Sequence, residues 1–432
     1  MPAALPPSRI RVLDRARIAG TDIEHAACVQ AGDWIFLCGI EASDPAAGLI
    51  AGVAPPPGLP FHGAPKHRRE ADAVFARMHT LLESAGSSLA HACRVDQYYT
   101  TWKAVDPYHT ARRAAFGKHI PPSTSIVMAG LAGAPFEMSV SLIAVRADAG
   151  RAPQRVSTDR LGAPVWSGFA PALTSGDFVF IAGQMARAPD GSHDPRAHRS
   201  PHSLWGGTEI RRQTEHIVTE SLVPALAAAG ASPAGALKAQ IYLRHIDDLP
   251  HVLDVWNAHF GERSVALTVV PAREFGHVGA DIEINLVALR DGAAVHKQIV
   301  CADVPAQCCF GAPAVRAGDL LLLSGLVPAD ADGPVDGGAA ARAWPGLAIE
   351  TRAQMHWLLA CAQTICTAGG TSLADVVRAQ CFATDAADLP ALHREWQLAT
   401  GTAAMPFAFA CTPAPQAVPA GRITLDLWAY AP

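Results

Sequence analysis

The chain has 432 residues, of which 50% are hydrophobic and 17% are charged, and its formal net charge is −5. This composition is typical of globular domains and excludes a largely disordered chain, and the length allows two to four domains with separate cores. The 34 Lys and Arg residues are spread along the chain without a basic cluster, which argues against nucleic acid as a partner.

The ten cysteines and the N-terminal residues indicate where in the cell the protein is expected. No C-x-x-C pair occurs, and the adjacent Cys308 and Cys309 match no zinc-ligand spacing. Residues 1–17 contain four arginines but no apolar signal-peptide core, and no stretch approaches the roughly 20 apolar residues of a membrane span. The sequence therefore predicts a soluble cytoplasmic protein with reduced, mostly buried thiols.

A turn signal, an apolar run and a glycine recur three times along the chain. Residues 31–42 read AGDWIFLCGIEA, residues 175–186 read SGDFVFIAGQMA, and residues 317–328 read AGDLLLLSGLVP. The closing glycines, Gly39, Gly183 and Gly325, are 144 and 142 residues apart. Each run has the length of a buried strand, so the spacing indicates three copies of one unit.

The later elements follow in the same order in each copy. Helical periodicity predicts a first helix over residues 71–86, 214–230 and 351–370, with Pro224 expected to kink the second. A strand is expected at 93–102, 237–246 and 377–386, and a second helix at 107–116, 249–260 and 389–398. Two strands end each copy, the last at 138–145, 282–289 and 423–430.

This order predicts an α/β fold in which both helices of a copy cover one face of a single sheet. Polar stretches near residues 150 and 298 divide the chain into three units: 1–150, 151–297 and 298–432. The longest insert, residues 188–208, carries His193, His198 and His202. Their spacing fits no ligand pattern, so a solvated loop is favoured over a metal site.

These signals resemble the RidA/YjgF family over essentially the whole chain. The shared features are the glycine-ended strand, the closing strand, and the link after the first helix, as in Gly86–Leu89 and Gly370–Leu373. The resemblance implies an α+β unit of the chorismate-mutase-like type. Family members are usually homotrimers with a central β-barrel, helices outside, and ligands between subunits. Three copies in one chain would form a covalent pseudo-trimer, and its further dimerisation is left open.

The resemblance also implies a chemistry. Family deaminases hydrolyse enamines and imines, with an arginine in a P-x-R-[ST] setting that binds the substrate carboxylate and a glutamate on the last strand. The first copy has Ser123 at the arginine position and Ser139 at the glutamate position. The second copy lacks the arginine within 264–268 but has Glu283 at the glutamate position. The third has an apolar stretch at 405–409 and Thr424.

Because no copy keeps the complete pair, other polar residues are candidates. We predict that Glu283 or His109 transfers protons and that Arg273 or Arg112 replaces the missing arginine. The expected substrate-binding residues are those on the cleft strands and the second helices: Ser123, Ser125, Tyr99, Arg112, Gly39, Gly183, Gly325 and His393.

Structural roles compete with these assignments. His109 and Arg112 also suit the solvated face of an amphipathic helix, and Glu283 also suits a barrel-lining position because it alternates with apolar neighbours. Ser123 and Ser125 could satisfy backbone groups near a turn. Cys38 is a nucleophile in one interpretation, but a buried structural thiol is favoured because no base lies nearby in sequence.

Two functions follow. The first is an enzyme that acts on an imine, enamine or carboxylated metabolite in a cleft between copies, by hydrolytic deamination or related hydrolysis or ring chemistry, in a catabolic or natural-product pathway. The alternative is a catalytically degenerate metabolite-binding or scaffold protein. A nuclease is disfavoured by the acidic balance. We expect a small-molecule partner, no membrane partner and no metal or cofactor, since no G-x-G-x-x-G, P-loop or H-E-x-x-H motif is present.

Overall fold

The computed structural model describes residues 10–432 except 55–57, 59–62, 134, 158–167, 189, 193, 201, 203–204, 206, 337–342, 344–348 and 403. Within this part of the chain, three large sheets share one strand order. In each, an antiparallel run of three strands is followed by the last strand of that third of the chain, and then by a parallel pair.

The first sheet has the order β1-β2-β3-β9-β6-β7, with β1 Ile10–Arg17, β2 Glu24–Ala31, β3 Trp34–Ile40, β9 Met138–Val145, β6 Ala92–Tyr99 and β7 Ser123–Val127. The second has β10 Gln154–Val156, β11 Ala172–Ser175, β12 Phe178–Gln184, β15 Ile282–Arg290, β13 Ala231–Leu243 and β14 Ala266–Pro271. The third has β16 Lys297–Val300, β17 Ala314–Ala317, β18 Leu320–Leu323, β23 Ile423–Tyr430, β21 Val376–Ala383, β22 Phe407–Cys411 and β8 Gly130–Leu131. Two small hairpins pair β4 Ser43–Asp44 with β5 Gly48–Leu49, and β19 Ala329–Asp330 with β20 Gly333–Pro334.

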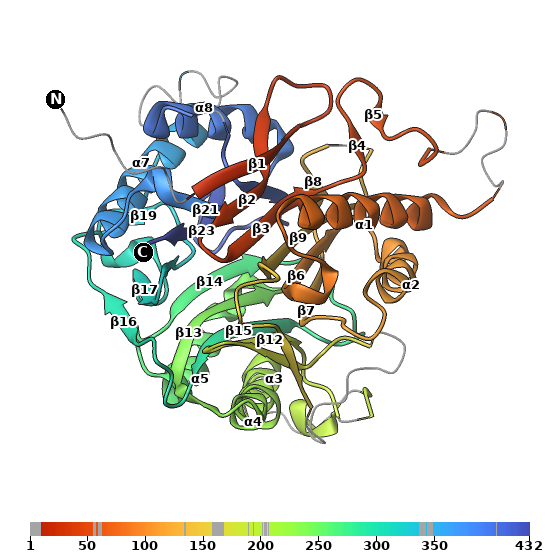
Figure 1. Ribbon diagram of the computed structural model, residues 1–432. Coiled ribbons are helices and arrows are strands. Elements are labelled where there is room, and N and C mark those ends of the chain that lie inside the picture. The colour runs from red at the N-terminus through yellow and green to blue at the C-terminus, as the bar shows by residue number, and fades with distance from the viewer. Residues whose placement is uncertain are drawn as a thin grey trace.

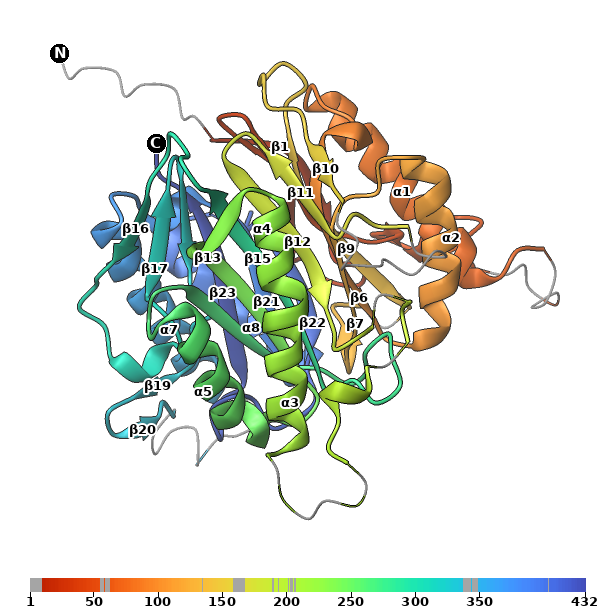
Figure 2. The same ribbon diagram turned by 90° about the horizontal axis from the view of Figure 1, so that it is seen from below.

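Helices accompany each sheet. The first has α1 Lys66–Ser84 and α2 Val105–Phe116, the second has α3 Glu209–His216, α4 Val223–Ala228 and α5 Leu249–Phe260, and the third has α7 Ile349–Ala368 and α8 Leu389–Thr400. Short 3₁₀ turns include η2 Trp102–Ala104, which leads into α2, and η6 Ala306–Cys308. The helices lie on the outside around the three sheets (Figure 1, Figure 2).

Each sheet has its own core against its helices. On α1, Val74, Met78 and Leu82 recur every four residues, which puts them on one face, and all three are buried against the first sheet. Equivalent clusters of buried side chains join α3 to α5 with the second sheet, and α7 and α8 with the third. The amphipathic periodicity of the sequence therefore marked the helices that cover the sheets.

The structure differs from the expected elements in two places. Each sheet begins with an additional strand, β1, β10 or β16, which the sequence did not reveal because these strands are short or largely polar and exposed. The second place is the helix in which a kink at Pro224 is predicted: it continues through Pro224, and its irregular turn lies just before the proline. A π turn over Ile217–Leu222 widens the helix immediately before α4, in which Pro224 occupies an early position where its missing N–H is tolerated.

The inner faces of the three sheets pack on one another. One apolar cluster contains Trp34 and Phe36 of β3, Phe180 of β12, Leu322 of β18 and Trp428 of β23. These side chains are almost completely buried. The three sheets therefore share a central core, whereas a closed barrel remains a prediction.

Buried ion pairs cross this centre. Asp96 on β6 accepts hydrogen bonds from Arg94 at 2.8 Å and from Arg378 on β21 at 2.6 Å. Lys238 on β13 lies 3.0 Å from Asp426 on β23. Because an unpaired buried charge is strongly unfavourable, these pairs tie the three sheets to one relative arrangement.

Neighbouring sheets meet along three seams. At the first seam, β7 lies against β12, and Val127 exchanges backbone hydrogen bonds with Glu274. At the second, β14 lies against β18, and Leu267 accepts from the Gly325 N–H at 2.9 Å. At the third, β22 lies against β3, and Met405 accepts from the Ala26 N–H.

Candidate functional site

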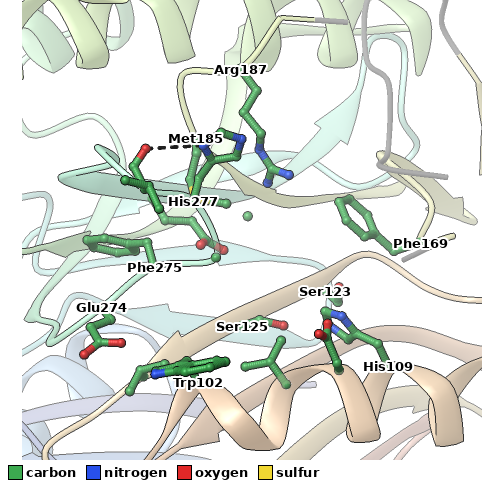
Figure 3. A pocket seen from close by; sticks show the side chains of 17 residues that line it. Trp102, His109, Ser123, Ser125, Phe169, Met185, Arg187, Glu274, Phe275 and His277 are labelled. Carbon is green, nitrogen blue, oxygen red and sulfur yellow. Dashed lines mark hydrogen bonds between the residues drawn. The ribbon is translucent and has the colours of Figure 1, made fainter. Parts of the chain in front are cut away.

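A cavity of about 520 Å³ lies at the first seam. One wall comes from η2, α2 and β7, and the other from β12, β15 and the segment that follows β14 (Figure 3). Its lining residues are Trp102, Val105, Asp106, His109, Ser123, Ser125, Val127, Phe169, Gly183, Met185, Arg187, Glu274, Phe275, Gly276, His277, Val278 and Glu283. Five of the residues predicted from the sequence are among them: His109, Ser123, Ser125, Gly183 and Glu283.

Glu283 supplies a buried carboxyl group to this cavity. Its side chain rests against Gly183, where an added Cβ would overlap Oε1 and lie 2.8 Å from Cδ. Burial raises the pKa of Glu283 to about 7, although the positive charge of Arg187 and the Ser125 N–H both oppose the shift. A carboxyl group with this pKa exists in both protonation states near neutral pH, which suits general acid–base chemistry.

Arg187 brings a cation into the same cavity (Figure 3). It follows β12 by three residues and lies close enough to Glu283 for the two charges to interact. Among the described residues, no hydrogen-bond or ion-pair partner of its guanidinium is found. A guanidinium without a carboxylate partner in a cavity is suited to bind an anionic group of a ligand.

The wall formed by β7 presents serine hydroxyl groups that are hydrogen-bonded to buried side chains behind them. Arg112 Nη1 on α2 donates to Ser123 Oγ at 2.9 Å, and Ser125 Oγ donates to Gln97 Oε1 at 2.5 Å. Tyr99 donates to the same Gln97 oxygen at 3.4 Å. Arg112 and Tyr99 are fully buried and stand behind the lining, so they position the two serines and do not face the cavity themselves.

His109 faces the cavity from α2 and is 6% exposed. Burial, with the positive charges of Arg112 and Arg113, holds the pKa of His109 well below its ordinary value. The imidazole is therefore neutral at physiological pH and can accept a proton or hydrogen bond.

Apolar side chains form much of the remaining lining. Val127, Met185 and Phe275 are buried, whereas Trp102 is 64% exposed and Val278 is 95% exposed. Phe169 and Phe275 lie on either side of Arg187 as seen in Figure 3. The site therefore combines a few polar groups with an apolar surface, which is common in small-molecule sites.

The other predicted residues lie elsewhere. Arg273 is outside the lining with its side chain 56% exposed, because its backbone N–H bonds to Val127 and the next residue, Glu274, faces the cavity instead. Gly39 lies at the third seam, where a Cβ would come within 2.9 Å of the Phe407 carbonyl. His393 is buried on α8, and its charge acts on His25 of the third seam. Gly325 lies at the second seam.

Strand register gives corresponding positions at the three seams. Tyr98, Tyr242 and Phe382 pair with Ser139, Glu283 and Thr424, so these three residues hold the same place in the strand order of their sheets. Three residues earlier on the same strands, the parallel partners are Ser123, Leu267 and Phe407. The position where the resemblance implies an arginine is therefore polar in the first sheet only.

The second seam is closely packed. A Cβ on Gly325 would lie 2.8 Å from the Thr268 side chain, and the Gly325 N–H is bonded to Leu267. Thr424, which occupies the position of Glu283, donates to Gln416 at 3.2 Å. At the second seam, therefore, the residues that correspond to Gly183 and Glu283 are in contact with neighbouring protein groups.

The third seam buries two titratable groups, His25 and Glu41. Burial lowers the pKa of His25 to about 4, and its ring packs edge-on against Phe407 with 5.2 Å between ring centroids. Burial raises the pKa of Glu41 to about 8, although the Ser139 hydroxyl lowers it. Cys38, beside Gly39, is buried, and burial raises the pKa of its thiol to about 12, so it has little nucleophilic character.

The sequence did not predict the role of Arg187 or of the apolar residues around it. Arg187 lies in the connection after the glycine strand, where no periodic pattern fixes the direction of a side chain. Its one available signal is its position four residues after Gly183. Phe275, His277 and Val278 belong to a similar irregular connection between β14 and β15.

Among the residues that the structure describes, no group of three or more His, Cys, Asp or Glu side chains has the geometry to hold a metal ion. His198 of the long insert pairs with Glu209, and His193 lies outside the described residues. None of the helices described combines the length and apolar character needed to cross a bilayer.

Comparison with known proteins places part of this chain in a family. Residues 162–290 match the family model described as Endoribonuclease L-PSP, which marks this segment as a RidA/YjgF-type domain. A RutC family protein of Pyrococcus abyssi is 25% identical over 138 residues, or 32% of this chain and 96% of the relative. A RutC family protein of Pyrococcus horikoshii is 27% identical over 121 residues, or 28% of this chain and 84% of the relative.

Solved structures are similar to a third of the chain. Yeast Mmf1 is 21% identical with a TM-score of 0.27, and RidA from the Antarctic bacterium Psychrobacter sp. is 24% identical with a TM-score of 0.26. Each match covers 32% of this chain and at least 98% of the solved chain.

Proposed function

We propose that the chain is an enzyme that hydrolyses a small carboxylated imine in the first-seam cavity, with Glu283 as the proton-transfer group. The observation that carries this proposal is the buried Glu283 carboxyl against Gly183, in a cavity that also contains Arg187. The family match of residues 162–290, which include all three residues, adds to it.

The reaction needs one group that moves protons in both directions. Ionised Glu283 would take a proton from water as the oxygen attacks the imine carbon, which forms a C–O bond and moves the C=N π electrons to nitrogen. Protonated Glu283 would then return the proton to nitrogen. Glu283 then carries the hydroxyl proton to nitrogen as the C–N bond breaks and the C=O bond forms, so the products are a 2-oxo acid and ammonia. A pKa of about 7 serves both steps at neutral pH.

The surrounding groups have complementary tasks. Ser123 and Ser125 present hydroxyls that can hydrogen-bond the water or the developing amine, and Arg112 holds Ser123 in position at 2.9 Å. His109, being neutral, can accept a hydrogen bond from the imine nitrogen without adding positive charge. These roles depend on groups that the fold already holds in fixed positions.

The test uses imino acids generated in solution from L-amino acids by an amino acid oxidase, with 2-oxo acid formation followed above the spontaneous rate. Glu283→Gln keeps the side-chain volume but cannot transfer protons, and its turnover should fall about 10²- to 10⁴-fold. Glu24→Gln, at the partly exposed start of β2, is the matched control. Unchanged turnover in Glu283→Gln would refute the assignment.

A non-catalytic binding protein is the second candidate. It is favoured by the absence of arginine at the three equivalent positions Ser123, Leu267 and Phe407. In that case the ligand leaves the protein with its mass unchanged, whereas hydrolysis of an imine replaces NH by O. Mass spectrometry of the recovered ligand separates the two functions.

We also propose that the chain is a tandem triplication that builds a cytoplasmic pseudo-trimer with a barrel-like centre, divided at 1–150, 151–297 and 298–432. The common strand order of the three sheets and their shared core support this arrangement. One chain would then be the functional unit, with a solution mass near 45.2 kDa. A species of three chains in sedimentation would contradict it.

A further inference from the structure

Building on the proposed function, we infer that the substrate of the first-seam cavity is a carboxylate with a large apolar substituent, of aromatic size, whose carboxylate is bound by Arg187. The inference concerns which carboxylated molecules the cavity accepts. The inference rests on the volume of the cavity, on the distribution of charge along the cavity wall, and on the apolar lining.

The volume exceeds what the smallest imino acids need. A cavity of about 520 Å³ falls in the range of sites that enclose drug-sized molecules. A three-carbon acid would leave most of this space to water, in contact with Val127, Met185 and Phe275. Water against apolar walls is unfavourable, so a ligand that displaces it is preferred.

The charged side chains of the cavity differ in how deeply they are buried. Arg187 lies next to the buried Glu283, whereas the two other carboxylates of the lining are less buried: Asp106 is exposed and Glu274 is partly exposed. An anionic group is therefore favoured beside Arg187 and not at the mouth.

The position of Arg187 also explains how an anion could bind without the arginine that β7 lacks. Ser123 occupies that place on the β7 wall, and Arg187 enters from the opposite wall after β12. A carboxylate bound to Arg187 would lie close to Glu283, because the two side chains already interact electrostatically. The carbon next to that carboxylate would then be within reach of the proton-transfer group.

The remaining surface is apolar and in part open to solvent. Phe169 and Phe275 line the cavity and lie towards opposite sides of it in Figure 3. Trp102, 64% exposed, and Val278, 95% exposed, also line the cavity. Exposed apolar side chains at a cavity are typical of ligand-binding surfaces, and aromatic rings bind other aromatic rings favourably. The substituent of the substrate would be buried against these side chains.

Binding of stable oxo acids tests this inference independently of turnover. Calorimetry would compare 3-phenyl-2-oxopropanoate with 2-oxopropanoate and with the uncharged 3-phenylpropanamide. Burial of the phenyl group should make the first bind about 10- to 100-fold more tightly than the second. The uncharged amide should bind at least tenfold more weakly than the phenyl oxo acid, because it has no carboxylate for Arg187.

Variants of the protein measure separately how much the carboxylate and the phenyl group of the ligand contribute to binding. Arg187→Met should weaken both oxo acids about 10- to 100-fold, and Arg187→Lys should restore part of the loss. Phe275→Ala should remove most of the preference for the phenyl compound and leave 2-oxopropanoate binding nearly unchanged. Arg273→Met, a neighbouring exposed arginine outside the lining, is the control and should have no effect.

The outcomes distinguish this inference from the proposed function. Equal affinity for the two oxo acids, or a loss of binding in Arg273→Met but not in Arg187→Met, would overturn the inference. Imine hydrolysis that depends on Glu283 would still stand in that case. Conversely, phenyl oxo acid binding through Arg187 without hydrolysis of any imino acid would support the ligand class and refute the proposed function.

Discussion

Replacement of Glu41 by Gln is predicted to make the protein more resistant to alkaline pH. Burial at the third seam raises the pKa of Glu41 from 4.5 to about 8, and the charge of Glu70 adds to the rise. The folded state therefore holds a proton that the unfolded chain releases. Its contribution to stability is fully present below pH 4.5 and is lost as the pH rises towards 8.

The magnitude follows from the pKa difference. At about 1.4 kcal/mol for each unit, the wild type should lose roughly 4 to 5 kcal/mol relative to Glu41→Gln between pH 4.5 and pH 8. For a chain of this length that unfolds as one unit, the unfolding entropy translates the loss into a Tm difference of about 5 °C. The glutamine keeps the shape and the neutral state of the protonated glutamate.

Thermal and urea unfolding at pH 5, 6, 7 and 8 measures this difference for the wild type and for Glu41→Gln. Glu283 also has a raised pKa, but it is present in both proteins, so its contribution cancels in the comparison. Glu24→Gln, on the partly exposed end of β2, should follow the wild type at every pH. A stability gap between Glu41→Gln and the wild type that stays constant across these pH values would refute the reasoning.

Three further predictions follow from particular contacts. Gly183→Ala should lower turnover of an imino acid about 100-fold while the protein stays folded, because the new methyl group would displace the Glu283 carboxyl; kinetics and circular dichroism check this. Turnover should rise with pH through about 7, since ionised Glu283 takes the proton from water, and a kcat/KM profile without an inflection there would count against that role. Asp96→Asn should destabilise the protein by about 3–5 kcal/mol in urea unfolding, because Arg94 and Arg378 would keep their buried charges without the carboxylate; a change below about 1 kcal/mol would show that these charges are solvated or otherwise balanced.

Local patterns in the sequence were sufficient to place most of the helices and strands. The expected last strands at 138–145 and 423–430 coincide with β9 and β23, and the expected helix at 249–260 coincides with α5. The helix is readable because one of its faces is buried, whereas the two strands are buried along their whole length. The missed strands β1, β10 and β16 are short or exposed and carry no such pattern.

The candidate site was only partly predictable for a related reason. Glu283 and Ser123 lie on regular strands, where position along the strand decides which way a side chain points, so equivalent positions could be found by comparing the copies. Arg273 and Arg187 lie in irregular connections, where the sequence does not show which way a side chain points. Arg273 was predicted because it closely follows residues 264–268, but in the structure its backbone N–H bonds to Val127 and its side chain is outside the lining, whereas Arg187 lines the cavity.

The order of residues along the chain thus predicts three similar stretches of helices and strands, and the polar residues in which these stretches differ. The cavity at the first seam is lined by side chains from two different sheets: Glu283 lies against Gly183 in the second sheet, and Ser123 belongs to the first, whereas at the second seam the side chain of Thr268 lies against Gly325. Volume and charge at such a place are sums over groups far apart in sequence. No single segment carries that information, because it arises only when the sheets pack together.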